Sequence, residues 1–146
     1  MRNELNVWVI GGDMRQVSLA ELLEGDGHTV HTWGLEGAEE CPGKEADFRK
    51  AVLADCVILP LPAMGEDGRL NAPLAEEGPL IEQVLDALRP GQVVCGGRVS
   101  PQLQAMALER DLRLWDYYAR EELAVSNAVP TALAVGHWEK RAGAHI

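Results

Sequence analysis

Short apolar runs alternate with amphipathic segments along this chain. Largely apolar runs of four to six residues are typical of buried strands and occur at 5–10, 30–33, 56–61, 92–95 and 112–115. Apolar spacing of the helical kind predicts helices over 14–24, 47–53, 79–88 and 100–110, and from about 127 to 141. Such strands, each followed by a helix, favour a parallel sheet covered on both faces. The pattern predicts a single α/β domain: a doubly wound, flavodoxin- or Rossmann-like sheet of five parallel strands in the order 2-1-3-4-5.

This topology also predicts where a ligand would bind. In a doubly wound sheet, ligands lie beyond the carboxyl ends of the strands, where the winding reverses. Here that switch point falls between the first and third strands, so the turn at 11–16 should face the loop at 62–68. Gly96 and Gly97, at the end of the fourth strand, and the segment 118–131 should lie nearby.

The turn at 11–16 lacks a dinucleotide-binding pattern. Counted from Gly11, the pattern G-x-G-x-x-G requires glycine at positions 13 and 16, where this chain has Asp13 and Gln16. A carboxylate at position 13 would repel a pyrophosphate bound at the helix N-terminus. The second strand also ends without the acidic residue that binds ribose in such folds. We therefore expect no cofactor-binding residue in this domain.

The same turn has a structural interpretation and a functional one. Asp13 as the N-cap and Gln16 three residues later form a capping-box pattern. Arg15 is not explained by that pattern, because a cation in the first helical turn is unfavourable against the helix dipole. A guanidinium holds a carboxylate through two hydrogen bonds. Arg15 is therefore a candidate for binding an anionic ligand.

Two further groups are candidates for the same site. Gly96 and Gly97 would let the backbone approach a ligand closely, although a tight strand-to-helix turn explains them as well. Pro130 is tolerated only in a first helical turn, so Asn127 or Ala128 lies near the start of the last helix. Asn127 and Thr131 are four residues apart and share a face. This helix has little left to pack against, so we expect it to meet a partner or another domain.

Charge and composition exclude several classes of protein. The 13 basic and 23 acidic residues give a formal net charge of −10, which argues against a nucleic-acid partner. No apolar run approaches the roughly 18–20 residues that span a bilayer, and the N-terminus does not read as a signal peptide. The three cysteines are widely spaced and form neither a disulfide framework nor a clustered metal site. We expect a cytoplasmic protein without a metal.

Several segments together resemble the family of the dipicolinate synthase A subunit. Two blocks near opposite ends of the chain carry most of the likeness, GGDxRQ and N-x-[IV]-P-T. The matching segments are VIGGDMRQ at 9–16, GHTV at 27–30, ILP at 58–60, GEDG at 65–68, GG at 96–97, AREELAV at 119–125 and NAVPT at 127–131. The resemblance extends over nearly the whole chain.

The resemblance implies the N-terminal, substrate-side domain of a two-domain oxidoreductase. In that family a C-terminal Rossmann domain, absent from this chain, binds NADP. The reaction oxidises a dihydrodipicolinate-type precursor to dipicolinate (pyridine-2,6-dicarboxylate) during sporulation, with the B subunit of dipicolinate synthase as a partner. This chain departs from the family pattern at two positions, where Leu133 and Ala134 stand in place of a Glu and a Gly.

On this interpretation residues 1–126 form the substrate-side domain and 127–146 an interdomain-type helix and tail. The catalytic residues are not identified, and the isolated domain should be inactive. The residues expected to bind a small dicarboxylate are Gly12, Asp13, Arg15, Gln16, Gly96, Gly97, Asn127, Pro130 and Thr131. The alternative is a standalone, non-catalytic ligand-binding module that forms a homodimer through its last helix.

Overall fold

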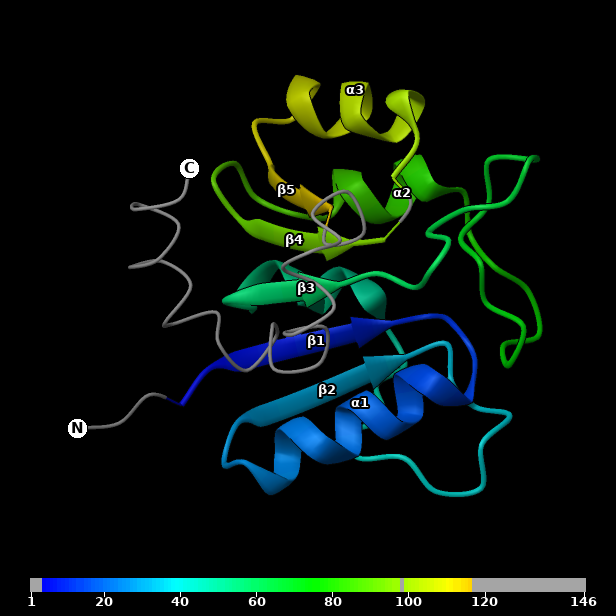
Figure 1. Ribbon diagram of the computed structural model, residues 1–146, viewed down its shortest axis with the longest axis vertical. Helices are drawn as coiled ribbons and strands as arrows, with labels where there is room; N and C mark the ends of the chain where they lie inside the picture. The colour runs from blue at the N-terminus through cyan, green and yellow to red at the C-terminus, as the bar shows by residue number, and fades with distance from the viewer. Residues whose placement is uncertain (1–3, 98, 117–146) are drawn as a thin grey trace.

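A computed structural model describes residues 4–97 and 99–116 of this chain. Within them, five parallel strands form one sheet in the order β2-β1-β3-β4-β5, which confirms the predicted α/β topology (Figure 1). The strands are β1 (Asn6–Ile10), β2 (Thr29–Trp33), β3 (Cys56–Ile58), β4 (Val93–Gly96) and β5 (Arg113–Asp116). The predicted helix at 127–141 and the proposed boundary at 126 lie outside the described residues.

Four helices connect the strands and cover both faces of the sheet. They are α1 (Met14–Gly25), the 3-10 helix η1 (Phe48–Leu53), α2 (Ile81–Asp86) and α3 (Pro101–Glu109). Strand β1 is buried on both faces, because Val7 and Val9 pack in the core under α1, whereas Trp8 and Ile10 pack under η1, α2 and α3. Burial of both faces explains why this strand is apolar at every position after Asn6.

Two elements are shorter than the sequence pattern predicted. Strand β3 ends at Ile58 and not at 61, although the Leu59 N–H still donates to the Cys95 carbonyl at 2.8 Å. The prolines at positions 60 and 62 have no N–H with which to continue the ladder. Helix α2 spans Ile81–Asp86 and not 79–88, with Leu80 as its N-cap. Pro90 disfavours helical backbone at the residue before it, which helps to end this helix early.

The segment from residue 59 to residue 80 is a folded loop at the carboxyl ends of the strands. Isolated antiparallel bridges join Met64 to Leu70 and Arg69 to Leu80. The Asn71 side-chain amide donates to the Pro62 carbonyl at 2.9 Å. These bridges and this hydrogen bond therefore hold the backbone of the loop in one arrangement next to the switch point between β1 and β3.

Candidate functional site

The Gly11-Gly12 turn joins β1 to α1 at the switch point. Both residues have positive φ, +71° and +94°, which favours glycine at each position. The Gly11 N–H donates to the Trp33 carbonyl, and the Gly12 N–H donates to the Asn71 carbonyl, each at 2.8 Å. These two amides, which could otherwise cradle a phosphate, are bonded to the chain's own carbonyls. The turn therefore does not fit the phosphates of NADP.

The space beside Gly12 is filled by Gln16 and Pro60. A Cβ at position 12 would overlap the Gln16 Cγ and would lie 3.0 Å from the Pro60 Cβ. Gln16 is 7% exposed, and its side-chain Nε2 is buried without a hydrogen-bond partner among the described residues. Glycine at position 12 thus lets a glutamine side chain lie between the start of α1 and the end of β3.

The N-cap of α1 is Asp13, as the sequence predicts, but its hydrogen bond differs from a capping box. The Asp13 carboxylate accepts from the Arg15 N–H at 2.9 Å. The Gln16 backbone N–H instead donates to the Asp13 carbonyl at 2.9 Å. The Gln16 side chain instead lies against Gly12, so it does not complete the predicted reciprocal pair.

Arg15 forms a two-point ion pair within the same turn. Its Nε and Nη2 each lie 3.1 Å from one oxygen of Asp13, and Nη2 also lies 3.3 Å from the Leu61 carbonyl oxygen. The Arg15 side chain is 70% exposed. Hydrogen bonds from Arg15 lower the pKa of the Asp13 carboxyl below its ordinary value. The guanidinium spans the switch point from α1 to the segment after β3.

The predicted glycines at the end of β4 approach the chain itself. A Cβ at Gly96 would lie 3.3 Å from a Val99 methyl carbon and 4.0 Å from the Leu59 Cβ. The Val99 N–H donates to the Asp116 carboxylate at 2.9 Å, which ties the turn after β4 to the end of β5. Gly97 follows β4 in this turn. These contacts support the strand-to-helix interpretation of the pair.

Four of the nine predicted binding residues gather at the start of α1. Gly96 and Gly97 lie at the end of β4, at the same edge of the sheet. The remaining predicted binding residues, Asn127, Pro130 and Thr131, lie outside the described residues. The four that gather are Gly12, Asp13, Arg15 and Gln16.

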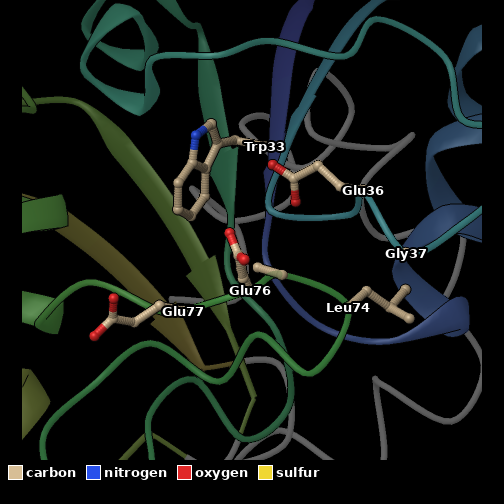
Figure 2. A pocket seen from close by; sticks show the side chains of 7 residues that line it. Trp33, Glu36, Gly37, Leu74, Glu76 and Glu77 are labelled. Carbon is tan, nitrogen blue, oxygen red and sulfur yellow. The ribbon is translucent and has the colours of Figure 1, made fainter.

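An acidic cavity, which the sequence pattern did not predict, lies beyond the end of β2. It has a volume of about 620 Å³ and is lined by Trp33, Glu36, Gly37, Leu74, Ala75, Glu76 and Glu77. Figure 2 shows the side chains of Glu36 and Glu76, from separate loops, reaching toward the space beside Trp33. Carboxylates repel an anionic ligand, so a dicarboxylate is better placed at Arg15 than here.

This cavity forms because two loops far apart in the sequence meet. The Gly37 N–H donates to the Leu74 carbonyl at 2.8 Å, and a Cβ at position 37 would lie only 3.0 Å from Leu74 atoms. The available signal in the sequence was three glutamates outside the predicted strands and helices, at positions 36, 76 and 77. Their convergence depends on the loop contact, which hydrophobic periodicity does not encode.

Neither a metal site nor a membrane-spanning element is found in the part of the chain that the structure describes. Within residues 4–97 and 99–116, no three His, Cys, Asp or Glu side chains lie close enough together to hold a metal ion. Among the same residues, no helix is long and apolar enough to cross a membrane.

Solved structures with a similar fold span more than this chain. The A chain of dipicolinate synthase from Bacillus subtilis is 21% identical with a TM-score of 0.71, over 97% of this chain and 49% of that one. The dipicolinate synthase A subunit from Bacillus halodurans is 22% identical with a TM-score of 0.67, over 87% and 45%. D-2-hydroxyisocaproate dehydrogenase is 16% identical with a TM-score of 0.51, over 85% and 39%. This chain therefore covers about half the length of the dipicolinate synthase structures.

Sequence comparison places the chain in a family. A search of curated proteins found no match. The family model for the N-terminal domain of the dipicolinate synthase A subunit matches residues 6–118, which is most of the chain. This match includes the GGDxRQ block at the start of α1 and the matching segments up to 96–97, and it confirms the resemblance that they carry. The segments at 119–125 and 127–131 lie beyond the matched residues. The chain belongs to the family of dipicolinate synthase A-subunit N-terminal domains.

Proposed function

We propose that this chain is the substrate-side domain of a cytoplasmic oxidoreductase that forms dipicolinate from a dihydrodipicolinate-type precursor during sporulation. The family supports this assignment. In the proposal, residues 1–126 form the substrate-side domain, and 127–146 lead toward a second domain that binds NADP. The B subunit of dipicolinate synthase is the proposed protein partner.

The position of Arg15 carries the proposal. Its guanidinium reaches the Leu61 carbonyl across the switch point, where doubly wound sheets bind their ligands. A carboxylate of the substrate would pair with this guanidinium, next to the helix N-terminus, which also favours negative charge. The residues of the proposed site are Gly12, Asp13, Arg15, Gln16, Gly96, Gly97, Asn127, Pro130 and Thr131. Within this site, Asp13 holds the guanidinium until a carboxylate of the ligand takes its place.

Oxidation of the precursor ring removes a hydride and a proton. The described residues offer no phosphate cradle at the Gly11-Gly12 turn, so we assign no hydride-transfer step to them. Their proposed contribution is to bind and orient the carboxylates of the ring. The isolated domain is accordingly expected to bind the dicarboxylate without oxidising its precursor.

Calorimetric titration with pyridine-2,6-dicarboxylate tests this proposal. We expect the wild-type chain to bind and Arg15→Ala to bind about tenfold more weakly, since charged hydrogen bonds contribute roughly 1.5–3 kcal/mol. Arg49→Ala is the matched control, because Arg49 pairs with Asp47 at the start of η1 as Arg15 pairs with Asp13. An unchanged affinity in Arg15→Ala would remove Arg15 from the site.

The second candidate is a non-catalytic module that binds ligands or dimerises through 127–146. The Asp13–Arg15 ion pair favours it, because the guanidinium is already neutralised by a carboxylate of the same turn. This candidate predicts a dimer in sedimentation experiments and no affinity for the dicarboxylate. The titration therefore separates the two functions.

A further inference from the structure

Two glutamines are buried in the described part of the chain, and their hydrogen bonding differs. Gln92 is 2% exposed; its Nε2 donates to the carbonyls of Ala51 and Ala54, each at 2.8 Å, and its Oε1 accepts from the Arg89 N–H at 3.0 Å. Gln16 is 7% exposed, and its Nε2 has no partner among the described residues. A buried amide left unpaired destabilises a folded protein, so the Gln16 side chain requires an explanation.

The location of Gln16 provides one. Its side chain lies against Gly12 and faces Pro60, and the adjacent Arg15 reaches the carbonyl of Leu61. Consecutive side chains of the first turn of α1 therefore face one short segment at the end of β3. Asn6 Oδ1 is also buried without a partner in the described part of the chain, but it lies at the start of β1, away from the carboxyl edge where this fold binds ligands.

We propose that the Gln16 carboxamide positions a carboxylate ligand, by donating from Nε2 to a carboxylate oxygen between the start of α1 and residues 60–61. This inference rests on the proposed function and deepens it, by naming the group that orients the acid. Arg15 supplies positive charge from the exposed side of the turn, and Gln16 supplies a hydrogen-bond donor from its buried side. The twelve-residue helix α1 adds a favourable N-terminal dipole.

A carboxylate suits the proposed place between the start of α1 and residues 60–61 better than a phosphate does. The Gly11 and Gly12 N–H groups, which a phosphate would need, donate to carbonyls of Trp33 and Asn71. The Asp13 carboxylate lies in the same turn, and it repels the single charge of one carboxylate group less strongly than the nearly two charges of a phosphate monoester group. A planar carboxylate with two oxygens needs only the guanidinium on one side and one amide donor on the other.

Gln16→Met tests the inference, with Gln92→Met as its matched control. Methionine keeps the length of the side chain and removes its donor. We expect Gln16→Met to unfold at the same urea concentration as the wild type or a higher one, and to bind pyridine-2,6-dicarboxylate about tenfold or more weakly. Gln92→Met should unfold at a lower urea concentration, because it leaves two buried carbonyls unpaired, and should bind the dicarboxylate as the wild type does.

The outcomes separate this inference from the proposed function. Equal binding of the dicarboxylate by the wild type and a folded Gln16→Met overturns the role of Gln16 and leaves the proposed function standing. If the wild type binds inorganic phosphate and no dicarboxylate, the carboxylate ligand named in both proposals is wrong. If neither probe binds the wild type, both proposals are contradicted.

A measurement on the wild-type chain covers the case in which Gln16→Met does not fold. The side-chain NH₂ signals of 15N-labelled glutamine report directly on each carboxamide. We expect the Gln16 pair to shift on addition of pyridine-2,6-dicarboxylate, whereas the Gln92 pair stays in place. If the dicarboxylate binds and the Gln16 signals do not move, the inference is overturned.

Discussion

The guanidinium of Arg15 lies on the carboxylate of Asp13, with two nitrogen–oxygen distances of 3.1 Å. The helix that they begin has no other acidic residue in its first turn to offset the arginine. Asp13 therefore supplies the anion that a first-turn arginine requires, and an incoming carboxylate must compete with it. This competition makes Asp13 a regulator of ligand affinity in the proposed function.

Replacement of Asp13 by asparagine should strengthen binding of the dicarboxylate. Asparagine remains a good N-cap, so the helix start is retained, while the negative charge that competes for Arg15 is removed. We expect the affinity for pyridine-2,6-dicarboxylate to rise several-fold in calorimetric titration. Asp47→Asn, which removes the equivalent carboxylate beside Arg49, should leave the affinity unchanged. A weaker complex with Asp13→Asn would show that Asp13 assists the ligand.

The Asp13 carboxyl should titrate below its ordinary pKa of 3.8. The hydrogen bonds from Arg15 are the main cause of the lowered pKa. A carboxyl with a lowered folded-state pKa contributes stability above its unfolded pKa, and this stability is lost as the pH falls through the folded value. Because the pair is exposed, the effect on unfolding should be small. Carboxyl 13C titration by NMR should give a midpoint below 3.8, and Arg15→Ala should move it upward.

The three cysteines should differ sharply in reactivity. Cys56 and Cys95 are buried on neighbouring strands with their sulfurs 3.7 Å apart, and this contact together with burial raises the pKa of the Cys56 thiol well above its ordinary value. Cys41 is partly exposed. We expect a thiol-specific reagent at pH 8 to modify one cysteine rapidly in the native chain and all three cysteines after unfolding. Rapid native labelling of Cys41→Ser would contradict this.

The sheet could be predicted from the sequence because its signal is local. Each strand that packs on both faces is apolar over consecutive residues, and the helices between strands fix the parallel connections. The N-cap at Asp13 is also a local pattern. The early ends of β3 and α2 were missed, since apolar residues continue beyond both elements and only prolines oppose them.

The surroundings of Gly12 and Gln16 depend on contacts between segments far apart in the sequence, and the periodicity of hydrophobic residues does not encode such contacts. The Gly12 N–H bonds to Asn71, although 59 residues separate them along the chain. From the sequence, Arg15 was a candidate for binding an anionic ligand, whereas in the structure its guanidinium pairs with the Asp13 carboxylate. The sequence pattern made Gln16 a capping residue and did not indicate that its Nε2 would be buried without a partner among residues 4–97 and 99–116.

Alanine at position 12 should destabilise the chain more than alanine at another glycine with positive φ. Gly91 has a φ of +86° and open space around it, so Gly91→Ala should cost only the left-handed backbone strain, roughly 1–2 kcal/mol. Gly12→Ala adds an overlap with Gln16 and a close contact with Pro60, for about 1–3 kcal/mol more. Urea unfolding of both variants measures the difference.

The source of that difference can be isolated with a second substitution. In a Gln16→Ala background the overlapping Cγ is gone, whereas the Pro60 Cβ at 3.0 Å and the Cβ of residue 16 at 3.3 Å remain. Gly12→Ala should therefore cost less than in the wild type, and still more than Gly91→Ala does. Recovery of this kind is a coupling between neighbouring residues, which a double-mutant cycle measures directly. If Gly12→Ala lowered the free energy of unfolding equally in both backgrounds, Gln16 would not occupy the space beside the turn. The placement of its side chain against Gly12 would then be wrong.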